Sequence, residues 1–386
     1  MNAFEVVDLI ARGETSTVQF KEQKINKDSL AAELVAMSNS LGGDILFGVR
    51  DKDGTIVGLG YQELQEIGNT VATVANASVL PPVYVSTEVV SISMEDGNEK
   101  KILIVHVPEG IAKPYKDCHG AFWIKVAGDK RRITDNNEIL RLFQQSGVVY
   151  VDELAVPETS EDLIDRTKVA TYLVKIDDSS DVTYSRTLFR NLGIMKGDKL
   201  TLGGLFFFSF KPQQYRPVFC IKAISFFGND IGGCSYRGSV DITGTIPEMF
   251  NKGMDFFDTY LKHIQQGQNF NSVGKLEVSH IALEEVLQNA LVHRDYSKNA
   301  PIRIMIFDNR IEIVSPGCLP NHLSVENIKL GNAVVRNNLI VSYASKLMPY
   351  RGFGSGIRRA MLEQPNIEFE NDRDGEQFLV RIPRTS

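Results

Sequence analysis

The sequence has few cysteines, and they form no recognisable pattern. Only four of its 386 residues are cysteines, with no Cys-x-x-Cys pair among them: Cys118, Cys220, Cys234 and Cys318. The six histidines show no spacing that would complete a zinc site with these thiols. We therefore expect reduced cysteines and no structural zinc. The neighbours Cys118 and His119 are expected at a loop tip, with side chains that point apart.

A long apolar run and an excess of positive charge are also missing. No stretch approaches the roughly 18 uninterrupted apolar residues of a membrane span, and the first ten residues, MNAFEVVDLI, are acidic where a signal peptide would be basic. With 42 lysines and arginines against 48 aspartates and glutamates, the net charge is −6. A histone-like role is excluded, and affinity for nucleic acid must come from a local basic surface. These features predict a cytoplasmic protein that does not contact a membrane.

The composition is otherwise that of a globular protein, with 43% hydrophobic and 23% charged residues, and the chain is long enough for two or three domains. We expect the first domain at residues 1–147. Its predicted elements are a helix at 26–40, strands at 44–49 and 55–59 around a turn at 51–54, a helix at 62–76, strands at 83–92, 101–107 and 122–126, and a helix at 136–145.

The remainder divides near residue 245. Residues 148–245 are expected to form a β-rich connecting region, because its hydrophobic segments 203–210 and 219–227 have the composition of strands. Residues 246–386 are expected to form the last domain, with helices on one face of a mixed sheet. Its predicted elements are helices at 247–266 and 279–293, strands at 301–307 and 310–314, a helix at 336–348, a glycine loop, another helix and a closing hairpin.

One predicted helix carries a polar stripe. Glu285, Asn289 and His293 recur every four residues and therefore lie on one face. A stripe of this kind either lies in solvent or faces a polar ligand. Further along the chain, Gly352 and Gly354 precede Gly356 at alternate positions, directly before a predicted helix. Alternating glycines expose backbone N–H groups and a helix N-terminus adds partial positive charge, so this loop either suits a phosphate chain or is a tight turn.

Four motifs together resemble the divergent GHKL-type ATPase domain of bacterial proteins often labelled transcriptional regulators or RecG-helicase-related. The motifs are EEVLQNALVHRDYS (284–297), IRIMIFDNRIEIVSPGCLP (302–320), RNN (336–338) and GFGSGI (352–357). The resemblance covers about residues 246 to 386 and implies an α/β sandwich that binds ATP and Mg²⁺.

This resemblance also implies roles for single residues. Asn289 would hold Mg²⁺ against the phosphates, and Glu285 would be the catalytic base that orients water, which agrees with the preference of Mg²⁺ for oxygen ligands. The residues implied to contact the cofactor are Asn289, His293, Gly317, Gly352, Gly354, Ser355 and Gly356. GHKL enzymes contact adenine through an aspartate, whereas this chain has Ser315-Pro316-Gly317. We therefore expect nucleotide binding with weak or absent turnover.

A second candidate site lies between Lys113 and Arg132. This segment combines Asp117 and Asp129 with six basic residues, Lys113, Lys116, Lys125, Lys130, Arg131 and Arg132, so that its local net charge is +4. Tyr115, Phe122 and Trp123 are interleaved with them. Charge for phosphates and flat rings for bases are typical of nucleic-acid surfaces. An ordinary hairpin with Trp123 in the core is the alternative.

The N-terminal motifs resemble the Schlafen-type AlbA-like domain over about residues 5 to 145. They are GETSTVQFKEQ (13–23), AMSNSLGGDILFGVRDKDGTIVGL (36–59) and the segment 113–134. The resemblance implies an α/β domain that binds DNA or RNA, with some members cleaving RNA through clustered carboxylates. The matching positions are Glu14, Gln19 and either Asp51 or Asp53. Because an amide can neither act as a base nor bind a metal as an anion, Gln19 disfavours nuclease activity.

The sequence thus predicts an α+β multidomain protein: an AlbA-like α/β domain, a β-rich connector and a GHKL-type α/β sandwich. We expect a DNA-binding transcriptional regulator, commonly a homodimer when the DNA site is symmetric, with a nucleotide as a second partner. The alternatives are a metal-dependent nuclease of Schlafen type and a degenerate, non-catalytic scaffold.

Overall fold

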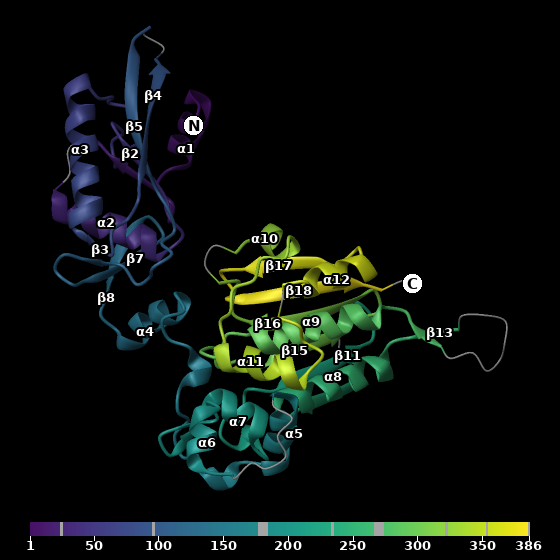
Figure 1. Cartoon of the computed structure of the whole chain (residues 1–386). Coiled ribbons are helices and arrows are strands. Elements are labelled where there is room, and N and C mark those ends of the chain that lie inside the picture. The colour runs from purple at the N-terminus through teal and green to yellow at the C-terminus, as the bar shows by residue number, and fades with distance from the viewer. Residues whose placement is uncertain are drawn as a thin grey trace. The chain divides into compact units, whose positions relative to one another are not determined.

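The computed structural model describes residues 1–23, 26–94, 97–176, 184–232, 235–265, 274–320, 323–352 and 354–384. The chain folds into two compact units, Met1–Val149 and Tyr150–Ser386, each with its own sheet and helices (Figure 1). The predicted α+β multidomain class is confirmed. Within the described ranges, no helix is both long enough and apolar enough to cross a bilayer.

The first unit is built on a four-stranded sheet with helices on both faces. In sheet order the strands are β1 (Val18–Lys21), β2 (Gly43–Phe47), β5 (Glu99–Val107) and β4 (Ser86–Ser93). Only the β1 and β2 neighbours are parallel. Because side chains alternate along a strand, Ile45 and Phe47 pack with α2 (Lys27–Asn39) and α3 (Tyr61–Ala77), whereas Leu46 packs on the side of α1 (Ala3–Arg12).

Short elements complete this unit. They are β3 (Val79–Leu80) paired with β6 (Lys116–Asp117), β7 (Phe122–Val126) paired with β8 (Asp129–Ile133), and α4 (Asn136–Gln145). At the end of α2, Asn39 donates from Nδ2 to the carbonyls of Tyr115 (2.8 Å) and Trp123 (2.9 Å), and its Oδ1 accepts from the N–H of Tyr115 (2.7 Å). These three bonds tie α2 to the segment around β6 and β7. The predicted strand at 55–59 is wrong, since this stretch forms only a single bridge between Val49 and Ile56.

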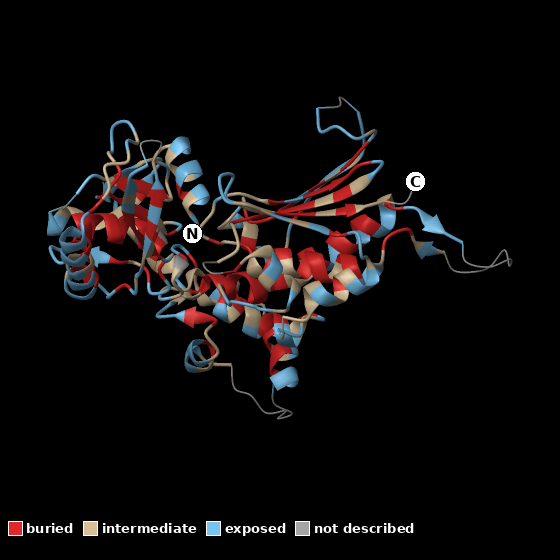
Figure 2. Cartoon of the chain, turned by 90° about the horizontal axis from the view of Figure 1, so that it is seen from above, coloured by how far each residue is buried: buried red, intermediate tan, exposed pale blue. Residues whose placement is uncertain are grey.

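The second unit is built on a six-stranded sheet. In sheet order its strands are β12 (Tyr236–Ile242), β11 (Ile221–Phe226), β15 (Ile302–Ile306), β16 (Arg310–Pro316), β18 (Gln377–Pro383) and β17 (Glu368–Asp372). The large core on one face of this sheet takes side chains from α5 (Arg166–Ile176), α7 (Leu202–Phe208), α8 (Ile246–Tyr260), α9 (His280–His293) and α11 (Asn338–Leu347). Figure 2 shows buried residues concentrated along the strands and these helices. The expected segregation of helices onto one face is confirmed.

Smaller elements surround this core. They are α6 (Arg186–Asn191), α10 (Val325–Lys329), α12 (Gly356–Glu363), the paired β9 (Met195–Lys196) and β10 (Lys199–Leu200), and the paired β13 (His263–Ile264) and β14 (Lys275–Leu276). The helix expected at 247–266 ends at Tyr260, and position 266 lies outside the described residues. Cys234 also lies outside them.

The stretch 148–245, which was expected to be β-rich, contains the three helices α5, α6 and α7 as well as strands. Residues 203–210 were expected as a strand, but Leu202–Phe208 form the helix α7. Every residue of α7 is buried, so the apolar pattern carries no period that separates a helix from a strand. The Oγ1 of Thr201 accepts from the N–H of Gly204 at 2.9 Å and caps the helix. The second predicted segment does form a strand, β11, which pairs with β15 and so joins the sheet of the residues beyond 245.

Candidate functional site

Helix α9 turns one polar face toward a cavity. Val286, Leu287 and Leu291 of this helix enter the large core of the second unit. Glu285 and Asn289, on another face, line a cavity of about 120 Å³ instead. Glu285 is only 5% exposed, so the solvated-stripe alternative does not describe this helix. The polar face of α9 is a wall of an internal site.

The cavity collects all the residues that the sequence predicted for a cofactor site. Its other walls come from the end of β16 and from the segment that leads into α12. The predicted residues that line it are Glu285, Asn289, His293, Gly317, Gly352, Gly354, Ser355 and Gly356. They belong to segments up to 71 positions apart in the sequence and are brought together by the sheet and by α9.

The glycines of the loop are required by close packing. Gly352 and Gly354 have φ values of +71° and +67°, which L side chains rarely adopt. A Cβ on Gly354 would overlap the carbonyl oxygen of Gly331, and one on Gly356 would overlap the carboxylate of Glu285. The missing side chains thus let the loop approach α9 closely. Phe353 lies outside the described residues.

Arg359, which the sequence did not identify as a site residue, pairs with the carboxylate of the cavity. The guanidinium of Arg359, on α12, forms an ion pair with the carboxylate of Glu285. Among the described residues that line the cavity, Glu285 carries the only carboxylate, whereas Arg336, Arg351 and Arg359 carry positive charge. The cavity wall is therefore net positive, which favours an anionic ligand.

Two nitrogen atoms in this wall lack partners. The Nδ2 of Asn289 and the Nε of Arg359 are buried and make no hydrogen bond within the described part of the chain. A buried donor without an acceptor costs about 1–3 kcal/mol. A ligand that brings acceptor oxygens would remove this cost at both atoms. These two orphaned donors point to a phosphate or a similar anion rather than to an apolar ligand.

A neutral pair closes one side of the cavity. The Nε2 of His293 lies 2.8 Å from the hydroxyl oxygen of Tyr350. Burial, together with the positive charge of Arg336, lowers the pKa of His293 to about 4, and burial raises the pKa of Tyr350 to about 12. Both groups are therefore neutral near pH 7, and His293 adds no charge to the site.

The hydroxyl hydrogen of Ser315, at the position where the GHKL resemblance places an adenine-binding aspartate, is already used. The hydroxyl of Ser315 donates to the carbonyl oxygen of Ala290 at 3.1 Å. Beyond it, Gly317 has a φ of +95°, and Arg336 donates from Nη2 to the carbonyl of Cys318 at 2.7 Å. Arg336 thereby fixes the loop that follows β16. The sequence has no aspartate at the position that contacts adenine in GHKL enzymes. Among the described residues of the wall, the only carboxylate is that of Glu285 on α9, which pairs with Arg359.

The residues present fit a phosphate-bearing ligand with Mg²⁺. The orphaned donors, the glycine loop and the arginines suit phosphate oxygens. Mg²⁺ is commonly held by one or two protein oxygens and completes its shell with phosphate oxygens and water. The side-chain amide of Asn289 would supply such an oxygen, and Glu285 is within the same wall.

Two of the six basic residues between Lys113 and Arg132 do not lie at the surface of the first unit. Lys113 and Lys125 are buried. The Nζ of Lys113 donates to the carbonyl of Ser40 at 2.9 Å, and the Nζ of Lys125 donates to Glu33 at 2.9 Å. Neither ammonium reaches the surface, because each is satisfied inside the unit. This corrects the prediction for Lys113 and Lys125, which were expected to belong to a nucleic-acid-binding surface.

The other four basic residues remain accessible to different degrees. Lys116 and Arg132 are exposed. Lys130 pairs with the second oxygen of Glu33 at 3.0 Å, and Arg131 forms two hydrogen bonds with Glu138. Of the aromatic residues between them, Tyr115 is buried and Trp123 is partly buried, with its Nε1 donating to Asp117. The hairpin alternative therefore accounts for these two rings.

The carboxylates that matched a nuclease site have other partners. Glu14 accepts from the side-chain amide of Gln19 and from the N–H of Phe20. Asp51 instead pairs with Lys21 at 2.8 Å. The ammonium of Lys125 lies 2.6 Å from the Oε1 of Gln19, so a lysine occupies the place beside Gln19. Over the described residues, Glu14 belongs to no group of three or more histidine, cysteine, aspartate or glutamate side chains that could hold a metal ion.

Comparison with known protein families finds one match in each unit. Residues 14–134 match the family described as "Schlafen, AlbA_2", and residues 299–382 match the family described as "Putative ATP-dependent DNA helicase recG C-terminal". The predicted resemblance to these two domain families is confirmed. The second match begins after α9, so it includes Gly317 and the glycine loop but not Glu285 or Asn289.

A solved structure resembles the chain along most of its length. It is the crystal structure of the DIP2311 protein from Corynebacterium diphtheriae, which is 19% identical, with 99% of this chain and 80% of that chain covered and a TM-score of 0.48. No protein of curated function matches the sequence.

Proposed function

From the two matched domain families, we propose that this protein is a cytoplasmic DNA-binding transcriptional regulator whose second unit binds ATP with Mg²⁺, or another phosphate-bearing ligand. In this proposal the bound ligand alters how the first unit engages DNA. The AlbA_2 match supports the nucleic-acid part, and the match to an ATP-dependent helicase family supports the nucleotide part.

The observation that carries the nucleotide part is the cavity between α9 and the glycine loop. Its wall contains two buried N–H donors, on Asn289 and Arg359, that have no partner among the described residues, and Glu285 is the only carboxylate among the described residues of the wall. A phosphate would accept from both donors and would lie against exposed backbone of Gly352 and Gly354. The bound Mg²⁺ would neutralise phosphate charge.

The proposal includes binding with slow turnover. To act as a base, the carboxylate of Glu285 must accept a proton from water. It is buried and forms an ion pair with Arg359, which stabilises the carboxylate and holds it away from water. Hydrolysis therefore requires Arg359 to leave Glu285, for example when its guanidinium moves to a bound phosphate.

The DNA part rests on a small group of side chains. Lys116 and Arg132 are exposed, and Lys130 and Arg131 reach the surface in ion pairs with Glu33 and Glu138. A phosphate can replace Glu138 beside Arg131 at little net cost, because exposed ion pairs contribute only about 0–1 kcal/mol. Glu33, the partner of Lys130, is buried, so Lys130 is less free to change partners. The expected affinity for DNA is accordingly modest and depends on salt.

The regulation can be tested by fluorescence anisotropy of a labelled duplex, titrated with the protein in the presence and absence of ATP and Mg²⁺. The proposal expects the dissociation constant to change by about fivefold or more, the usual scale of coupling between two sites. Asn289→Ala should remove this change, and Glu284→Gln, a matched variant on another face of α9, should retain it. An unchanged dissociation constant at saturating nucleotide would contradict the regulation. Cleavage of the duplex would favour the nuclease alternative.

A further inference from the structure

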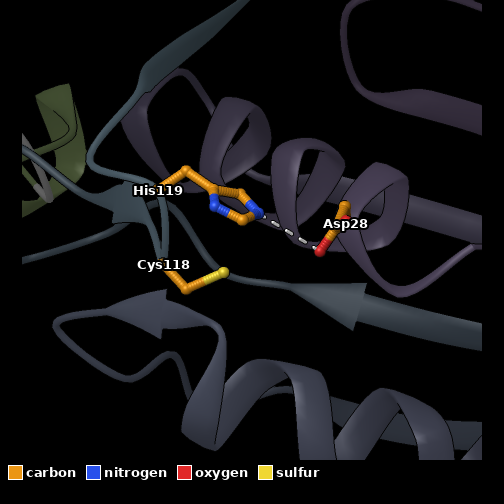
Figure 3. A group of neighbouring side chains, drawn as sticks. All are labelled: Asp28, Cys118 and His119. Atoms are coloured by element: carbon orange, nitrogen blue, oxygen red, sulfur yellow. Dashed lines mark ion pairs between the residues drawn. The ribbon is translucent and has the colours of Figure 1, made fainter.

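A second group of chemically competent side chains lies on the surface of the first unit, outside the sites described above. Asp28 is in the first turn of α2, and Cys118 and His119 are in the turn between β6 and β7. One ligand atom from each residue lies within 4.8 Å of the others. Figure 3 shows the imidazole directed at the Asp28 carboxylate, with the Cys118 sulfur on the same side. The expectation that Cys118 and His119 point apart is therefore wrong.

The distance between two of these atoms fits a shared cation better than a hydrogen bond. The Nε2 of His119 and the Oδ1 of Asp28 are 3.5 Å apart, longer than the usual 2.7–3.2 Å of an N–H···O bond. Two ligands of one tetrahedral zinc ion, at about 2.0–2.2 Å from the metal, are separated by about 3.4 Å. The pair is thus already at the spacing that a bound zinc ion requires.

Both segments that carry the ligands are fixed by hydrogen bonds of their own. The Oδ1 of Asp117 accepts from the N–H groups of His119 (3.0 Å) and Ala121 (2.8 Å), and the N–H of Cys118 donates to the carbonyl of Ser78 (3.0 Å). At the start of α2, the N–H of Asp28 donates to the side chain of Asn26 at 2.7 Å. A cation would therefore bind to a turn that is already formed.

The rest of the unit makes little use of these side chains. Cys118 is a free, exposed cysteine, and His119 is the one partner that the structure gives the Asp28 carboxylate among the described residues. The side chains of Asp28 and His119 are 69% and 68% exposed, so their convergence is not forced by packing. One sulfur, one nitrogen and one oxygen ligand suit a borderline-soft divalent cation, whereas Mg²⁺ and Ca²⁺ prefer oxygen alone.

We propose that Asp28, Cys118 and His119 form a surface site for Zn²⁺, or for Co²⁺ as its spectroscopic substitute, with the fourth position left to water or to a further ligand. Metal binding deprotonates the Cys118 thiol and uses the neutral imidazole of His119. The ion would join the start of α2 to the β6–β7 turn, two segments that are 90 positions apart in the sequence.

The site can be tested with Co²⁺ and Zn²⁺ on the purified full chain. The proposal expects a thiolate-to-cobalt charge-transfer band that saturates at one equivalent and that excess Zn²⁺ removes. Each of Cys118→Ser, Asp28→Asn and His119→Gln should weaken Zn²⁺ binding at least about tenfold, since loss of even an outer-shell partner costs 10–100-fold. His280→Gln is the matched control, because His280 forms a comparable exposed pair with Glu284 at 3.6 Å that belongs to no metal-ligating group of three among the described residues.

A second measurement does not depend on the variants. One equivalent of Zn²⁺ should slow alkylation of Cys118 at least about tenfold, measured by mass spectrometry, with Cys318 as the internal reference. Absence of the charge-transfer band, equal Zn²⁺ affinity of Asp28→Asn and the unchanged protein, or equal alkylation rates with and without Zn²⁺ would each overturn the proposal.

Discussion

The guanidinium of Arg359 on α12 forms an ion pair with the buried carboxylate of Glu285 on α9. This pair joins the helix that follows the glycine loop to the helix that carries the polar stripe. It also decides the chemistry of the cavity, because it occupies the only carboxylate among the described wall residues. The ion pair therefore favours a site that binds an anion over one that hydrolyses it.

The first prediction concerns the stability of this pair. Arg359→Met should lower the free energy of unfolding of the second unit by about 1–3 kcal/mol, because it leaves a buried carboxylate without a partner. The estimate is below that for a fully buried pair, since the Arg359 side chain is 32% exposed. The double variant Arg359→Met/Glu285→Gln should recover most of the loss. Hydrogen exchange of the α9 amides measures both, and equal protection in the two variants would refute the coupling.

The second prediction concerns the stability of the second unit at low pH. Burial lowers the pKa of His293 from 6.5 to about 4, so between these values the unfolded chain binds more protons than the folded one. Stability from this group is therefore complete above about pH 6.5 and is lost as the pH falls toward 4, by about 1–3 kcal/mol in total.

The measurement must separate His293 from Asp152, which acts in the opposite direction. Burial raises the pKa of Asp152 to about 6, so this group contributes stability at low pH that is lost as the pH rises through 6. Urea denaturation at several pH values, compared between the unchanged protein and His293→Gln, isolates the histidine. The variant should lose less stability than the unchanged protein between pH 6.5 and 4, and parallel curves would argue against a buried neutral imidazole.

The third prediction concerns Lys125 in the first unit. Its ammonium is buried and donates to Glu33, Gln19 and the carbonyl of Gly128. Lys125→Met should destabilise the unit by about 3 kcal/mol, because it removes a partner of a buried carboxylate. Trp123 is the only tryptophan of the chain and lies in β7 with Lys125, so its fluorescence reports on this unit alone. Arg132→Ala, at an exposed position, should change stability by less than about 0.5 kcal/mol.

The fourth prediction concerns DNA. If phosphates contact Lys116 and Arg132, then Lys116→Gln and Arg132→Gln should each lower affinity for all duplex sequences alike. Each should also reduce the slope of log K against log salt by about one unit. Lys222→Gln is the matched control, because Lys222 is an exposed lysine of the second unit that pairs with Asp241. Equal slopes for all of the variants would place the DNA-binding face elsewhere.

The sequence predicted the helices and strands that carry a clear period. The helix around Glu285 and the two strands that flank Asp308-Asn309 follow the predicted ranges within a few residues, because polar residues recur every four positions in the helix and a short polar turn separates the strands. Helix α7 was missed for the opposite reason, since all of its residues are buried. The strand expected at 55–59 failed because alternation alone does not supply a pairing partner.

The candidate sites were predicted unevenly. Glu285 and the glycine loop could be grouped because their spacing is local and each has a physical meaning. Arg359 could not be assigned to Glu285, since the two are 74 positions apart and a single arginine on a helix carries no signal of its partner. The net charge of the segment 113–132 likewise could not show that Lys125 is buried in an ion pair with Glu33.

Asp28 illustrates the same limit. Nothing in its sequence surroundings links it to Cys118 and His119, and only the folded first unit brings the three together. Residues that act through distant partners thus require the structure, whereas residues that act through local spacing do not.

Calorimetric titration of the second unit's cavity, in the intact chain, with ATP and Mg²⁺ tests the central claim most directly. We predict a one-to-one binding heat that Asn289→Ala weakens at least about tenfold, the cost of one hydrogen bond to a charged group, and that Glu284→Gln leaves unchanged. Absence of heat, or the same affinity in Asn289→Ala as in the unchanged protein, would contradict the claim and favour a scaffold that binds no nucleotide.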